Sequence, residues 1–91
     1  MSNESGRSNE EIIAICEEAF EPFPTVVELQ DFDHKIGVAV YPPNAGQIII
    51  FEGEPIEPLR NGEKLYELLR AGRRRLRNFG FPPDPWVHDP Q

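Results

Sequence analysis

Apolar residues recur with helical spacing in two stretches of this chain, and polar residues fill the opposite faces. In residues 8–21, one face of a helix would carry the apolar side chains, which are Ile12, Ile15, Cys16, Ala19 and Phe20. Ser8 and Glu11 have the spacing of a capping box, and Pro22 and Pro24 disfavour a helix beyond residue 21. The pattern predicts a helix that begins at Ser8, buries one stripe and exposes glutamates on its other face.

A longer helix is predicted over residues 61–79. Steps of 100° per residue group its apolar stripe, which consists of Leu65, Leu69, Gly72, Leu76 and Phe79. A second arc collects the cations Arg70, Arg73, Arg74 and Arg77, with Tyr66 at its edge. Asn61 is the predicted N-cap, and Gly80 is the residue predicted to end the helix. One helix thus combines a core-facing stripe with an arginine face.

Between the two helices the pattern changes to that of β-strands. Strands are predicted at residues 25–32, 36–41 and 47–53, and the third is apolar enough to be buried on both sides or nearly so. Turn-forming residues separate the strands at 31–35 and 42–46. Residues 54–59 carry two prolines and are predicted to be an extended connector. Three strands joined by short turns predict an antiparallel meander.

The order helix, three strands, helix predicts an α+β fold. Because two amphipathic helices can cover the apolar face of the sheet, we expect a two-layer α-β-β-β-α sandwich with both helices on one face. We expect a disordered lead-in at residues 1–7, a single domain at 8–80 and a Pro- and Trp-rich tail at 81–91. The order resembles that of double-stranded-RNA-binding domains in topology alone, because Asn61, Gly62 and Glu63 place no cations at the start of the second helix.

The other face of the predicted sheet would also be apolar. Its side chains would be Val26, Phe32, Tyr41, Ile49 and Phe51. An open patch of this kind is large for a monomer and indicates a partner. We expect Phe81, Trp86 and Val87 of the tail to fold back and cover part of it. A homodimer through the sheet and free exposure are the alternatives.

Composition fits one small domain in a reducing, cytoplasmic setting. Hydrophobic residues make up 38% and charged residues 27% of the chain, which is ordinary for a globular protein. A single cysteine excludes an intramolecular disulfide. No export leader and no apolar run of transmembrane length is evident, so we expect no membrane contact.

The net charge of −7 is unevenly distributed. Residues 1–59 carry 12 Asp and Glu against 2 Lys and Arg, whereas residues 60–79 carry 7 Lys and Arg against 2 Glu. Such a split favours separate acidic and basic surfaces.

Candidate catalytic chemistry is sparse. Cys16 lies in the apolar stripe of the first helix, where a packed thiol is expected in place of a nucleophile. Neither the turn residues Asp31, Asp33 and His34 nor the pair His88-Asp89 matches a metal-ligand spacing. No phosphate-binding loop or dinucleotide fingerprint is present, so we expect no cofactor, no metal and no enzymatic activity.

The arginine face is the strongest candidate for a binding site. Guanidinium groups recognise carboxylates and phosphates, and this face would be the main positive surface of an acidic protein. The predicted partner-binding residues are Arg70, Arg73, Arg74, Arg77, Tyr66 and Trp86. We expect an acidic protein partner or a second copy, with nucleic acid as the alternative and a merely solvated face as the simplest interpretation.

Overall fold

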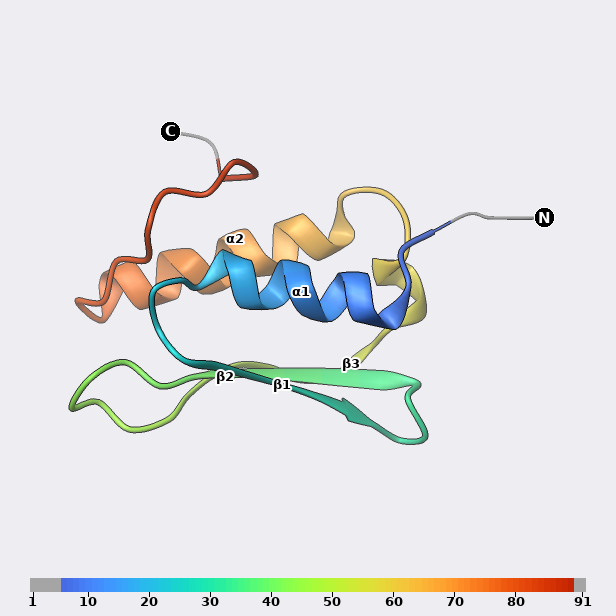
Figure 1. Cartoon of the computed structure of the whole chain (residues 1–91), viewed down its shortest axis with the longest axis horizontal. Helices are drawn as coiled ribbons and strands as arrows, with labels where there is room; N and C mark the ends of the chain where they lie inside the picture. Colours follow the sequence, from blue (N-terminus) through green and yellow to red (C-terminus); the bar gives the residue numbers. More distant parts are fainter. Residues whose placement is uncertain (1–5, 90–91) are drawn as a thin grey trace.

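The computed structural model describes residues 6–89, which form two helices on one face of a three-stranded sheet (Figure 1). The elements in chain order are α1 (Asn9–Ala19), β1 (Thr25–Gln30), β2 (Lys35–Val40), β3 (Ile48–Pro55), the 3₁₀ turn η1 (Glu57–Leu59) and α2 (Lys64–Asn78). The predicted α-β-β-β-α sandwich is confirmed.

The capping box at the start of α1 is present as predicted. The Glu11 amide donates to Ser8 Oγ at 3.1 Å, and the Ser8 amide donates to Glu11 Oε1 at 2.7 Å. These two bonds satisfy amides that a helix N-terminus otherwise leaves without partners. Ile12 and Cys16 are fully buried, which confirms the predicted stripe. Burial, and secondarily the charge of Glu17, raises the pKa of the Cys16 thiol to about 12, so this cysteine is a core residue and a poor nucleophile.

The strands form an antiparallel meander in the order β1-β2-β3. The register pairs Thr25 with Val40 and continues without a shift to the end of β1. Every second side chain along these two strands therefore faces the helices. On β2 the buried residues are Ile36, Val38 and Val40. The pairing of β2 with β3 shifts on both sides of Val38, which marks β3 as irregular.

Gly72 lets α2 approach the sheet closely. A Cβ at this position would lie 2.5 Å from Ile50 Cγ2 and 3.2 Å from Phe20 Cζ. Leu65, Leu69 and Leu76 complete the buried side of the helix, as predicted.

The ends of α2 and the connector before it differ from the prediction. The residue that caps α2 is Glu63 and not Asn61, because the segment after Ile56 forms η1 and a turn in place of an extended connector. That 3₁₀ turn buries both Ile56 and Leu59, which an extended chain would not do. Phe79 is 58% exposed, so the predicted stripe ends at Leu76.

Residues 1–5 of the predicted lead-in lie outside the described residues. Arg7 is firmly held against the η1 region: its amide donates to the Arg60 carbonyl at 2.8 Å and its Nη1 to the Leu59 carbonyl at 2.8 Å. Arg60 returns the contact through Nη1 to the Arg7 carbonyl and Nη2 to Asn9 Oδ1. This reciprocal pair joins the start of α1 to the start of α2.

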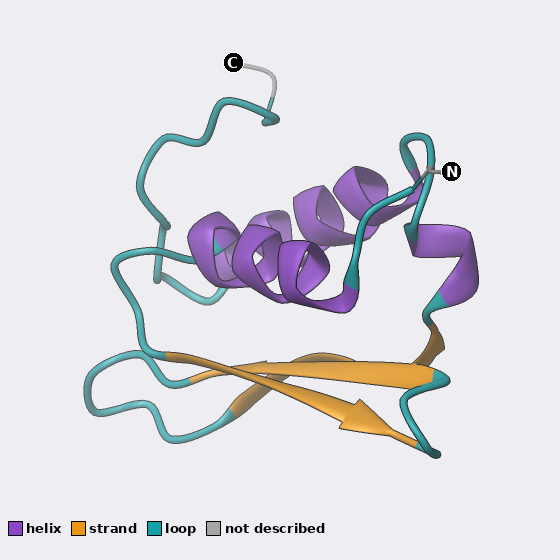
Figure 2. Cartoon of the chain, turned by 45° about the vertical axis from the view of Figure 1, so that its right-hand side comes forward, coloured by secondary structure: helices purple, strands orange, loops and turns teal. Residues whose placement is uncertain are grey.

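The C-terminal tail does not cover the sheet, contrary to our prediction. It runs over the helices on the side away from the strands, and no part of residues 6–89 lies beneath the outer sheet face (Figures 1 and 2). The Phe81 amide donates to the Leu76 carbonyl, and the Asp84 amide donates to the Glu21 carbonyl at 2.7 Å. The helix layer thus lies between the tail and the sheet.

Candidate functional site

Arg73 of α2 is buried by the tail and is not part of an exposed arginine face. Its side chain is 2% exposed. Nη1 donates to the Ala19 carbonyl at 2.5 Å, Nη2 to the Asp84 carbonyl at 2.7 Å, and Nε to Asp89 Oδ2 at 2.6 Å. A long, branched cation reaches three acceptors from α1 and the tail at once, which a helical-wheel projection does not represent.

Two further arginines of α2 also bind the tail. Arg70 donates through Nε to the His88 carbonyl at 2.7 Å and through Nη2 to Glu63 Oε1 at 3.0 Å. Arg77 donates through Nη2 to the same Asp89 oxygen that Arg73 binds. Only Arg74 of the four predicted residues is exposed without a hydrogen bond or ion pair within residues 6–89.

The predicted aromatic members of this surface pack on each other. Trp86 is 5% exposed and its Nε1 donates to Glu18 Oε1 at 3.3 Å. Tyr66 is half-buried and stacks on His88 with ring centroids 4.1 Å apart. The Arg7 guanidinium lies 4.8 Å from the Tyr66 ring centroid on a cation–π contact.

The structure therefore brings five of the six predicted residues together with the protein's own tail, and Arg74 is the exception. The acidic group that Arg73 and Arg77 bind is Asp89 of the protein's own tail. The sequence pattern grouped Arg70, Arg73 and Arg77 on one arc of the helix, and the structure places all three against the tail. The pattern missed that the terminal residues supply their acceptors.

Asp89 makes this tail contact dependent on pH. Burial raises the pKa of its carboxyl, but the hydrogen bonds and positive charges of Arg73 and Arg77 outweigh burial and leave that pKa below its usual range. A carboxyl with a lowered pKa stabilises the folded state above the pKa of the unfolded chain, about 4. That stabilisation is lost as pH falls through the lower folded-state pKa.

We expect Asp89→Asn to destabilise the protein most at neutral pH, with the difference from wild type shrinking below about pH 4. Urea unfolding at pH 7 and pH 3 measures this. Asp84→Asn is the matched control, because Asp84 uses its main chain and not its carboxylate in the tail contact. An equal loss for Asp89→Asn at both pH values would contradict the assignment.

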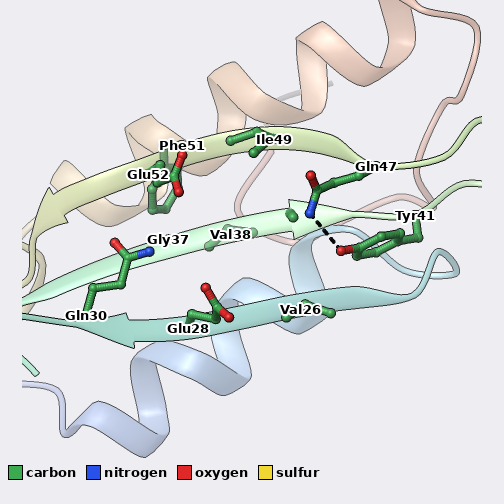
Figure 3. A pocket seen from close by; sticks show the side chains of 11 residues that line it. Val26, Glu28, Gln30, Gly37, Val38, Tyr41, Gln47, Ile49, Phe51 and Glu52 are labelled. Carbon is green, nitrogen blue, oxygen red and sulfur yellow. Dashed lines mark hydrogen bonds between the residues drawn. The ribbon is translucent and has the colours of Figure 1, made fainter.

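The outer face of the sheet is an uncovered apolar surface. Its most exposed large side chains are Val26, at 45%, Ile49, at 41%, and Tyr41, at 37%. Figure 3 shows them projecting from three neighbouring strands or strand ends, with Phe51 beside Ile49. The exposure of Ile49 overturns the prediction that the third strand is buried on both sides.

Polar groups surround the apolar centre of this face. Glu28 and Glu52 are exposed beside it, and the residues that line its shallow hollow, of about 90 Å³, include neither lysine nor arginine. Gln47 Nε2 donates to the Tyr41 hydroxyl at 2.7 Å and fixes one end (Figure 3). The surface is thus apolar in the middle and anionic at its sides.

Gly37 allows Gln30 to lie across the middle strand. Gln30 Oε1 accepts from the Gly53 amide at 3.1 Å, so its side chain reaches from β1 to β3. A Cβ on Gly37 would lie 3.2 Å from Gln30 Nε2, closer than most side-chain contacts. This amide bridge closes the hollow at the end opposite to Tyr41.

Within residues 6–89 no three His, Cys, Asp or Glu side chains gather closely enough to hold a metal ion. Neither described helix is long and apolar enough to cross a membrane. Comparisons of the chain with protein-family models, with curated proteins and with solved structures gave no match.

Proposed function

We propose that this protein is a small interaction module that acts by binding another protein, and that its binding surface is the outer face of the sheet. The observation that carries the proposal is the exposure of Val26, Tyr41 and Ile49 together on one uncovered face. Burying exposed apolar area is the main favourable term in protein association. In the helix layer, by contrast, Arg70, Arg73 and Arg77 are already bound by the tail.

The charges beside this face support a partner with an apolar centre and flanking lysines or arginines. Glu28 and Glu52 would pair with such cations, which gives selectivity and faster association more than affinity. A second copy is disfavoured, because it would bring two surfaces of like charge together on a protein of net charge −7.

A peptide-display experiment tests this proposal. Wild-type protein as bait should enrich peptides that combine apolar residues with lysine or arginine. The double variant Val26→Ser/Ile49→Ser should bind the enriched peptides at least about tenfold more weakly, because it removes the exposed apolar centre.

The matched control is Phe32→Ser/Val87→Ser, which removes two side chains that are 94% and 85% exposed. Phe32 was predicted on the outer face, but β1 ends at Gln30, so Phe32 lies in the following turn and does not line the hollow, and Val87 lies in the tail. The control variant should bind like wild type. Equal binding by the Val26→Ser/Ile49→Ser variant, or enrichment of acidic peptides, would overturn the proposal.

A further inference from the structure

The two edges of the sheet differ in their main-chain hydrogen bonding. On β3, Arg75 Nη1 donates to the Ile50 carbonyl at 2.9 Å, so a side chain of the helix layer already binds one main-chain acceptor of that strand. The shifted register beside Val38 also makes β3 irregular. Occupied and irregular edges are poor templates for an added strand. The β3 edge is therefore the less favourable template for an added strand.

The hydrogen-bond pattern shows which groups of β1 face outward. The Tyr41 amide donates to the Pro24 carbonyl, so these two opposed residues form a hydrogen-bonded pair. Such pairs alternate along an antiparallel ladder. The main-chain groups of Thr25, Val27 and Leu29 consequently point away from β2.

The pairing of β2 with β3 gives the same assignment independently. The Ile56 amide donates to the His34 carbonyl, so the main-chain groups of His34 point towards β3. Because this direction alternates along a strand, the main-chain groups of every second residue after His34 also point towards β3. Lys35 and Gly37 then face β1, opposite Gln30 and Glu28. Within residues 6–89 no side chain or other segment hydrogen-bonds the outward groups of β1.

Acidic side chains surround this open edge. The segment from residue 8 to residue 34, which includes α1 and β1, has eight Asp and Glu and neither Lys nor Arg. Helix α1 lies behind β1 and α2 behind β3 (Figure 3). Glu17 is exposed on α1 and lies about 100° around the helix from the buried Cys16, while Glu18, about 100° further on, accepts from Trp86 of the tail. Glu28 flanks the same edge on the outer face.

We infer that β1 accepts an extended, basic segment of another protein as a fourth strand. Its main chain would hydrogen-bond to Thr25, Val27 and Leu29, and its lysines or arginines would meet Glu17 and Glu28 on the two sides of the sheet. The inference rests on the proposed function, because it specifies how a basic partner engages the same sheet.

A second copy of this chain is a poorer occupant of the edge. Pairing β1 with β1 of another copy would bring together two segments that each carry eight carboxylates and no compensating Lys or Arg. Like charges placed directly across an interface cost affinity. Complementary charge therefore selects a basic strand.

The test uses the full chain and a capped nine-residue peptide in which lysine recurs at every third position between valine and threonine, so that lysines lie on both faces of the added strand. Binding should slow hydrogen exchange at the amides of Thr25, Val27 and Leu29 and leave the amides of β3 unchanged. The same peptide with glutamate in place of lysine should not bind. Two further peptides carry N-methyl groups, one on its odd-numbered residues and the other on its even-numbered residues. One of these two peptides should fail to bind, because its methyl groups replace the amide hydrogens that pair with β1.

A charge-matched pair of variants tests the acidic edge. Glu17→Gln/Glu28→Gln should weaken binding of the lysine peptide about tenfold, whereas Glu57→Gln/Glu67→Gln, which removes two exposed carboxylates elsewhere, should not.

The outcomes separate this inference from the proposed function. Binding that perturbs Ile49 without protecting β1, and that tolerates both N-methylated peptides, would overturn the added strand and leave the outer face as the binding surface. No binding of the lysine peptide would overturn the inference, while the display experiment judges the proposed function independently. A doubled mass with protection of β1 in the free protein would overturn it in favour of a second copy.

Discussion

The Arg73→Met variant is expected to lose about 3–5 kcal/mol of unfolding free energy at pH 7, a large part of the total for a domain of this size. Methionine fills a similar volume but donates nothing. The Ala19 and Asp84 carbonyls would lose their donor, and the Asp89 carboxylate would keep only the partners other than Arg73. Removing one member of a buried charged network leaves the other members uncompensated. Urea unfolding followed by Trp86 fluorescence measures the loss.

Arg74→Met is the natural control, because it makes the same chemical change one residue away on the exposed side of α2. It should shift stability by no more than about 0.5 kcal/mol. Similar losses for the two variants would mean that the tail does not bury Arg73 in solution.

The Trp86→Ala variant is expected to lose about 3 kcal/mol, the lower end of the range for a buried aromatic residue, because the tail can partly close the space. Trp86 packs against Tyr66 with ring centroids 6.1 Å apart and lies 5.5 Å from the Arg73 guanidinium carbon. Thermal unfolding measures the loss. Val87→Ala, at a position that is 85% exposed, should leave the unfolding temperature unchanged.

The losses of unfolding free energy caused by Arg73→Met and Trp86→Ala should not be additive. Each substitution releases the same segment, so the double variant should lose less than the sum of the two single losses. Full additivity would show that Arg73 and Trp86 stabilise the protein independently, which contradicts a tail that is held as one unit.

The fold could be predicted from the sequence because its signals are local. The Ser8–Glu11 spacing set the start of α1, and alternation from Ile36 to Tyr41 set the middle strand. The extra turn at Glu57–Leu59 was missed because two prolines fit either an extended chain or the first turn of a helix.

The candidate site was harder to predict because it depends on contacts between residues far apart in the chain. Helical periodicity placed Arg73 beside Arg70 and Arg77, but burial of Arg73 required knowing where Asp84 and Asp89 lie. Periodicity likewise identified Val26 and Ile49 as facing outward. Whether the tail would cover them depended on its direction after Gly80, where a φ of +95° turns the chain back over the helices.

The unequal edges of the sheet also determine how many molecules an assembly can contain. A strand that joins at β1 meets main-chain donors and acceptors with no other partner within residues 6–89, whereas on β3 Arg75 already binds the Ile50 carbonyl. Head-to-tail growth of a sheet requires two open edges on every copy. If β1 is the edge that accepts a partner and Arg75 hinders addition at β3, each copy would take one added strand, and the proposed complex would be a 1:1 pair that does not extend into a fibre.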